Sequence, residues 1–274
     1  MFGKLINWLG GTQQTAALPD ALWAATIADL PFIACLSDED KDRLRELSEC
    51  FLAEKEFTTA GGLELTDAMC VSIAAQGCLP ILNLGIDYYR GWVGIVVYPD
   101  EFVIPRSIED EFGVVHEYDD VASGEAWEGG PLLISWRDAQ MAGSGYNVVI
   151  HEFAHKLDML SGGADGTPPL PADVSLADWE TTLLDAYDDF CAMVDAADAL
   201  GEETQLDPYA AENPGEFFAV MSETFFETPQ NLLDTYPALY RQLAAFYRQD
   251  PAGRQTGISA ARAMPRTPRS VPAG

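Results

Sequence analysis

Two of the three histidines in the chain, His151 and His155, are four residues apart, and Glu152 directly follows the first. This His-Glu-x-x-His pattern lies inside an apolar run, from Val148 to Asp158, whose spacing is typical of a helix. On an α-helix both imidazoles then share one face, where they can reach one Zn²⁺ while the glutamate lies beside the metal. A buried polar face of this kind needs partners. The pattern therefore predicts a buried helix that carries the metal site of a zinc hydrolase.

A catalytic zinc generally has three protein ligands and leaves one position for water, so a third ligand is needed. The segment from Tyr209 to Phe226 offers one. Asn213 suits a helix N-cap, Pro214 the first helical position, and Glu216 falls at the third. Glu216 and Glu223 are seven residues apart and face the same way, so one can ligate zinc while the other orients a ligand histidine. Glu216 can equally close a capping box, and its spacing alone leaves both interpretations open.

Periodicity divides the chain into a helical part followed by a mixed part. Residues 19 to 90 are predicted to be helical, with helix starts at Ser37 and Thr66. Between Trp92 and Trp136, strands of a mixed or antiparallel sheet are predicted, and His116 there is expected to be a strand or turn residue rather than a ligand. The remaining predicted helices cover residues 145–160 (the motif helix), 175–200, 214–227 and 230–249.

The fold class expected from these patterns is α+β. Residues 1–252 are predicted to form a single domain, with a helical N-terminal part at about 19–90 and a sheet and active-site part at about 91–250. Residues 253–274 contain arginine and proline but no acid, and are expected to be a disordered tail.

Charge and cysteine usage exclude several other classes of protein. A net charge of −29 would repel a phosphate backbone, so direct binding to nucleic acid is not expected. The five cysteines are odd in number and form no Cys-x-x-Cys pair, which argues against disulfides and a thiolate zinc site. The apolar run at residues 2–9 is too short for a signal peptide or a membrane span, so a cytoplasmic protein that does not enter the membrane is expected. The same run can alternatively form a small docking helix.

Several segments together resemble one known family. They include His151–Met159, Ala164–Pro169, Asn213–Val220 and Ser222–Phe226, preceded by Gly124–Trp127 and Gly130–Trp136. The chain resembles the Mlc titration factor A peptidases, a gluzincin group related to the catalytic domain of anthrax lethal factor, over most of its length. The resemblance implies a zincin-like metallopeptidase fold, with a mixed sheet, an active-site helix and further helices.

The resemblance also assigns roles to individual residues. It implies one Zn²⁺ per chain, held by His151, His155 and Glu216, with Glu152 as the general base and Tyr209 as a transition-state donor. It implies an aminopeptidase-like activity on short peptides and, in some bacteria, binding to the glucose-related repressor Mlc.

The chain departs from the gluzincin pattern at one position. Related gluzincins often carry an acidic residue four positions after the glutamate ligand, where this chain has Val220. Asp158 or Glu223 must then supply the carboxylate that orients a ligand histidine.

Two functions from different classes are compatible with this sequence. The first is an active zinc peptidase whose substrate backbone pairs with the strand Leu132 to Trp136, just before the motif helix. The second is a regulatory binding protein on a zincin scaffold that sequesters a transcriptional repressor such as Mlc. The presence of Glu152 favours the peptidase, because a pure binding protein has no chemical need for a general base.

Overall fold

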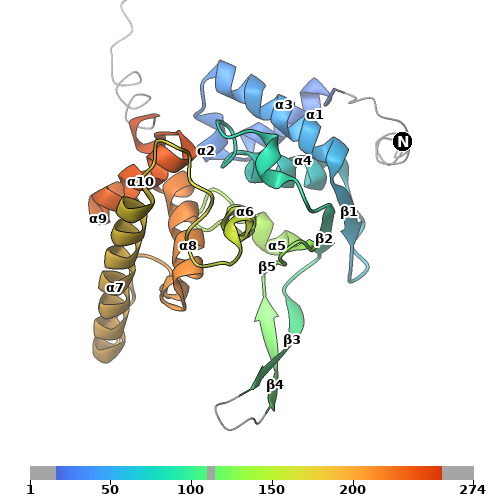
Figure 1. The fold of residues 1–274 in the computed structure, drawn as a ribbon. Helices are drawn as coiled ribbons and strands as arrows, with labels where there is room; N and C mark the ends of the chain where they lie inside the picture. Colours follow the sequence, from blue (N-terminus) through green and yellow to red (C-terminus); the bar gives the residue numbers. More distant parts are fainter. Residues whose placement is uncertain (1–16, 110–114, 255–274) are drawn as a thin grey trace, which may run out of the picture.

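The computed structural model describes residues 17–109 and 115–254, which form an α+β structure of helices around a small mixed sheet. The first helices gather at one end of the molecule, α7 to α10 lie on another side, and α6 lies between the two groups (Figure 1). The run at residues 2–9 and nearly all of the expected tail lie outside the described residues. The N-terminal helices are α1 (Asp20–Ala28), α2 (Pro31–Ala34), α3 (Asp38–Glu54), α4 (Asp67–Cys78) and the 3-10 helix η1 (Ile86–Tyr89).

Local capping determines where several of these helices begin. Ser37 accepts a hydrogen bond from the backbone N–H of Asp40, and Thr66 accepts one from that of Met69. These side chains satisfy N–H groups that a helix start leaves without a partner, which confirms both predicted starts. The later helices are α5 (Trp136–Ala139), α6 (Val148–Asp158), η2 (Met159–Ser161), α7 (Leu176–Leu200), η3 (Pro208–Ala211), α8 (Pro214–Glu227), α9 (Pro229–Thr235) and α10 (Pro237–Tyr247).

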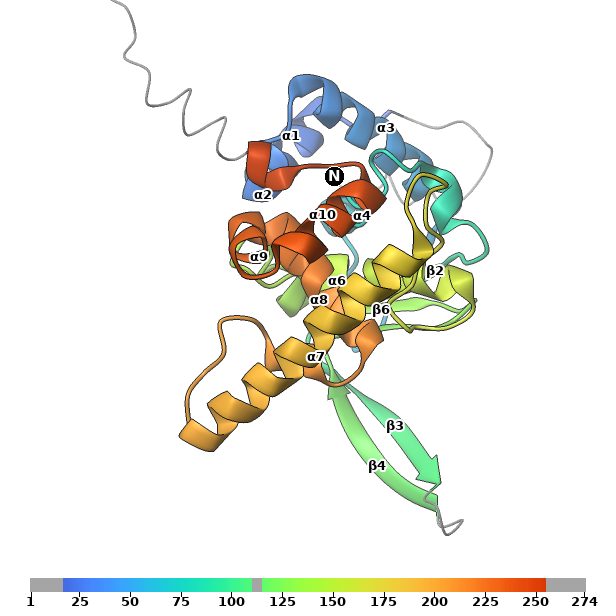
Figure 2. The same cartoon turned by 60° about the vertical axis from the view of Figure 1, so that its left-hand side comes forward.

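Four strands form the main sheet in the order β1-β2-β6-β5. The first three pair in parallel, and β5 pairs antiparallel with β6, so the predicted mixed sheet is confirmed. A separate antiparallel ribbon of β3 and β4 projects away from the body (Figure 2). The strands are β1 (Glu56–Thr59), β2 (Gly94–Tyr98), β3 (Phe102–Glu109), β4 (Val115–Ala122), β5 (Gly124–Ala126) and β6 (Leu132–Ser135).

Two sequence predictions about strands were wrong. Helix was predicted throughout residues 19–90, but β1 lies there, paired with β2 across a long connection that leaves no local turn signal. The strand from Leu132 was predicted to be the edge that receives a substrate, but β6 lies between β2 and β5. The outermost strand of the sheet on that side is therefore β5.

The motif helix α6 is buried along its whole length. Phe153 anchors it in an aromatic cluster, with its ring centroid 5.5 Å from that of Phe51, 5.1 Å from Tyr89 and 5.9 Å from Trp92. A side chain at Gly77 would collide with this ring, because a Cβ atom there would lie 2.4 Å from it. The core therefore fixes the back of the helix while its histidines face α8. Across residues 17–109 and 115–254, no helix has both the length and the apolar run needed to cross a bilayer.

Candidate metal centre

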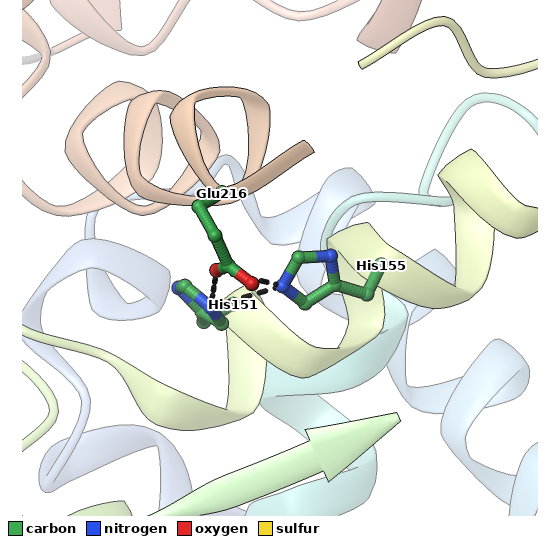
Figure 3. Close-up of side chains that lie close together, drawn as sticks. All are labelled: His151, His155 and Glu216. Atoms are coloured by element: carbon green, nitrogen blue, oxygen red, sulfur yellow. Dashed lines mark hydrogen bonds and ion pairs between the residues drawn. The ribbon is translucent and has the colours of Figure 1, made fainter. Parts of the chain in front are cut away.

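Two helices bring the candidate ligands together. His151 and His155 lie one turn apart on α6, and Glu216 lies in the first turn of α8 (Figure 3). Both helices start at an asparagine cap: Asn147 accepts from the N–H of Ile150 at 2.9 Å, and Asn213 accepts from that of Glu216 at 3.0 Å. The predicted cap at Asn213 is thereby confirmed. The Glu216 carboxylate points toward the histidines, which opposes the capping-box interpretation.

The three side chains present a compact triangle of donor atoms. Oε2 of Glu216 lies 3.1 Å from Nε2 of His151 and 3.1 Å from Nε2 of His155. The two Nε2 atoms are also 3.1 Å apart. Around a tetrahedral zinc with bonds of about 2.0–2.1 Å, ligand atoms are separated by roughly 3.3 Å, so the triangle fits a single small cation. Among the described residues this is the cluster of His, Cys, Asp and Glu side chains that can hold a metal ion.

The protonation of His151 shows why this triangle requires a cation. Its Nδ1 contacts Oε1 of Glu223 at 2.7 Å and must donate, since a carboxylate only accepts. In a neutral ring, Nε2 then carries a lone pair that faces the Glu216 oxygen, another acceptor. Burial lowers the pKa of His151, but its hydrogen bonds to Glu216 and Glu223 outweigh burial and raise that pKa well above its ordinary value. The site thus retains a positive charge, whether a proton or a metal.

Glu216 responds in the opposite direction. Burial raises the pKa of its carboxyl, but the hydrogen bonds from His151 and His155 outweigh burial and hold that pKa well below its ordinary value. Glu216 is therefore an anion at neutral pH. An anionic oxygen and two imidazole nitrogens form a typical zinc donor set.

Glu152 lies beside the triangle under strand β5. Burial raises the pKa of its carboxyl to about 8, although the charge of His151 opposes this. Its Oε2 is buried and has no hydrogen-bond partner among the described residues. A carboxyl in such surroundings can both take up and release a proton near neutral pH.

Gly124 of β5 is a site residue that the motif alone did not reveal. A Cβ atom at this position would lie 2.4 Å from Oε1 of Glu152 and 2.5 Å from its Cγ. Only a glycine lets the strand approach the carboxyl so closely. A glycine at the first residue of a short strand, between Ser123 and Glu125, is the sequence signal for such an approach.

An open cavity of about 530 Å³ lies in front of the triangle, lined by its three residues, Glu152, Tyr209 and residues 120–126. Tyr209 lies in η3, half-exposed, with its ring centroid 6.2 Å from that of His151. Burial, followed by the charge of Glu216, raises the pKa of Tyr209, so its hydroxyl keeps its proton at neutral pH. All five residues predicted for the site thus surround one cavity.

The two candidates for the supporting carboxylate have different contacts. Glu223 contacts the candidate ligand His151 and also accepts from the backbone N–H of Asn147 at 2.8 Å. Asp158 instead accepts from the backbone N–H of Gly166 at 2.7 Å and so fixes the loop that follows α6. The orienting contact therefore comes from Glu223, which lies one turn beyond the expected position at Val220.

A third glutamate on α8 supports the start of α6, and the motif did not predict it. Glu227 accepts from the backbone N–H of Gly143 at 2.9 Å and from Nδ2 of Asn147 at 2.8 Å. Its spacing of four residues from Glu223 was the available signal.

The remaining histidine, His116, lies in β4 opposite Ile108, as a strand residue.

Comparison with known proteins identifies the family. The model of the glucose-regulated metallo-peptidase M90 family matches residues 7–248. The chain belongs to this family. It is 39% identical over 250 residues to Mlc titration factor A of Cronobacter sakazakii (strain ATCC BAA-894), covering 90% of this chain and 93% of the relative. The protein of the same name from Serratia proteamaculans (strain 568) is 38% identical over 260 residues, covering 93% and 97%. The resemblance seen in the sequence is thereby confirmed.

Proposed function

We propose that this M90 protein is a zinc-dependent, aminopeptidase-like metallopeptidase that hydrolyses short peptides. One zinc ion per chain would be held by His151, His155 and Glu216. The observation that carries the proposal is the triangle of three donor atoms with 3.1 Å sides, beside the buried Oε2 of Glu152, which has no hydrogen-bond partner in the described part of the chain. Membership in a metallo-peptidase family supports the same function.

In the proposed mechanism, bound zinc supplies Lewis acidity, which polarises the scissile carbonyl and lowers the pKa of the attacking water. Glu152 accepts the proton of that water and transfers it to the leaving amine. The hydroxyl of Tyr209 donates a hydrogen bond to the developing oxyanion, a contribution of about 3 kcal/mol where such donors have been removed. Glu223 keeps the imidazole of His151 in the orientation that directs Nε2 toward the metal.

We further propose that the substrate backbone pairs with the edge strand β5. This strand pairs on only one side within the main sheet, lines the cavity and runs directly over Glu152. An extended peptide added to it would have its scissile bond beside the general base.

We also propose that residues 1–252 form a single domain with a zincin-like fold. It is supported by a continuous hydrophobic core that includes Leu18 near one end and Ala252 near the other.

The decisive variant is Glu152→Gln. It keeps the shape of the side chain but cannot accept the proton, so turnover should fall by about 10²–10⁴-fold while bound zinc stays near one per chain. Metal content by mass spectrometry and hydrolysis of a peptide panel measure both effects. Glu128→Gln, an exposed change in the turn after β5, is the matched control and should retain full activity. Near-normal turnover by Glu152→Gln would remove Glu152 from the mechanism.

A regulatory role is a second candidate, because the relatives carry the name Mlc titration factor A. In this role the chain would bind and sequester a transcriptional repressor of the Mlc type. Titration of the purified chain with the Mlc-type repressor of its own host, monitored by calorimetry, tests the role directly. Saturable binding together with no hydrolysis across the peptide panel would favour the regulatory role, whereas hydrolysis without binding would favour the peptidase.

A further inference from the structure

We propose that the β3–β4 ribbon extends the substrate site and binds the part of a peptide that lies on the C-terminal side of the scissile bond. This inference rests on the proposed peptidase function and adds a substrate class to it, peptides with an extended, largely apolar leaving segment. The ribbon projects away from the body in both views (Figures 1 and 2), and the end of β4 lines the cavity.

The first support is that the end of β4 and the whole of β5 line the cavity without a gap. The lining residues include every residue from Asp120 to Ala126, which covers the end of β4, Ser123 and all of β5. Side chains alternate between the two faces of a strand, so consecutive lining residues mean that the strand presents its edge to the cavity. The edge that passes over Glu152 in β5 thus continues into β4.

The second support is the direction of the chain. A peptide that pairs antiparallel with β5 runs from the C-terminal end of this strand toward its N-terminal end. Antiparallel pairing is the slightly more stable arrangement. The residues after the scissile bond therefore pass Ser123 and continue along β4. This is also the side on which the substrate of an aminopeptidase extends.

The third support is a ribbon that is fixed at its base but open on one face. Phe102 and Ile104 are buried in a small cluster with Leu133, and the ring of Phe102 stacks on that of Tyr98 at 4.3 Å. The opposite face of the ribbon is not buried in this cluster.

Val103 and Val121 face each other across the two strands on that open side, and they are 57% and 62% exposed. Asp119 follows on the same face, opposite Pro105, and is also exposed. The surface therefore suits apolar side chains, and a carboxylate at its edge disfavours acidic ones.

The test is a series of peptides with one fixed scissile bond and a leaving segment of increasing length. At about 3.4 Å per residue, a strand that starts beside Gly124 reaches Val121 within roughly three residues. We expect kcat/KM to rise about fivefold to tenfold once an apolar leaving segment passes this length, and to rise less when the added residues are glutamate. A length series that stays flat overturns the inference.

Strand addition also predicts an alternating pattern. N-methylation removes a backbone donor, and only every second residue of an added strand directs its N–H toward the partner. Methylation at successive positions of the leaving segment should therefore slow cleavage at alternate positions only. Uniform effects, or none, contradict pairing with β4.

A variant of the ribbon completes the test. Val103→Thr combined with Val121→Thr keeps β-branched side chains but removes apolar surface, so the ratio of kcat/KM for long and short peptides should fall about threefold. Val93→Thr is the matched control, since Val93 is 48% exposed and lies outside the cavity lining.

The outcomes separate the two proposals. If the wild type with zinc cleaves none of the peptides, the peptidase function fails. If it cleaves short and long peptides equally, only the ribbon inference fails. In a third outcome, Val103→Thr combined with Val121→Thr loses repressor binding while the dependence of kcat/KM on peptide length stays as in the wild type. The ribbon would then be a protein-docking surface, which also overturns the inference.

Discussion

A single methyl group added at Gly124 tests how closely β5 approaches Glu152, the proposed general base. In Gly124→Ala, the new Cβ would lie 2.4 Å from Oε1, 2.5 Å from Cγ and 2.7 Å from Cδ of Glu152. Non-bonded carbon atoms normally remain about 3.5–4.0 Å apart, so the carboxyl or the strand must move by roughly 1 Å. A misplacement of about 1 Å at a reacting group costs on the order of 10²-fold in rate. We therefore expect kcat/KM to fall about 100-fold.

The assay pairs hydrolysis of a reporter peptide with metal content and the melting temperature. The proposed metal ligands lie on α6 and α8 and not on β5, so the bound zinc should stay near one per chain while the rate falls. Gly163→Ala is the matched control, because a Cβ at Gly163 meets nothing within 4 Å. A 1 Å shift should cost roughly 100-fold in rate. If Gly124→Ala folds, binds metal and keeps its rate within about threefold of the wild type, the close approach of β5 to Glu152 has no catalytic importance.

Three further changes test the support of the site. Glu223→Gln removes the charge that orients His151, so zinc affinity in a chelator competition should fall about 10–100-fold, and an unchanged affinity would show that this contact is unimportant. Glu227→Ala leaves the buried side-chain N–H of Asn147 and the backbone N–H of Gly143 without their acceptor. It should lower the free energy of unfolding in urea by about 1–3 kcal/mol, and no change would refute the role of Glu227 at the start of α6. Phe153→Ala should lower the free energy of unfolding by about 3–5 kcal/mol, whereas Leu176→Ala, at an exposed position, should change it little. Equal losses in the two variants would contradict the packing described for α6.

The features that sequence predicts well here depend on neighbours along the chain. Asn213, Pro214 and Glu216 follow the local rules of a helix start, and the helix α8 begins where the sequence predicts it. The spacing of His151 and His155 is equally local. Short-range patterns of this kind therefore identify most of the candidate site.

The features that sequence missed depend on contacts between distant segments. Asp158 and Glu223 were equal candidates for the carboxylate that orients His151, because each lies on the same predicted helix as a candidate ligand. Only the packing of α6 on α8 shows that Glu223 is the one that contacts His151. Strand order is similarly non-local. β5 rather than β6 is the edge strand because β6 pairs with β2 on one side and with β5 on the other, and the sequence of β6 alone does not show these partners. The short strand β1 was missed because its partner is β2, which follows it only after α4 and η1.

Anomalous X-ray diffraction at the zinc absorption edge, on crystals of the purified protein, tests the proposed zinc site directly. We expect one strong peak per chain, about 2.0–2.1 Å from Nε2 of His151, Nε2 of His155 and one carboxylate oxygen of Glu216, with Glu223 beyond bonding distance. A peak coordinated by Glu223 instead, or fully metal-loaded protein without a peak at this triangle, would contradict it.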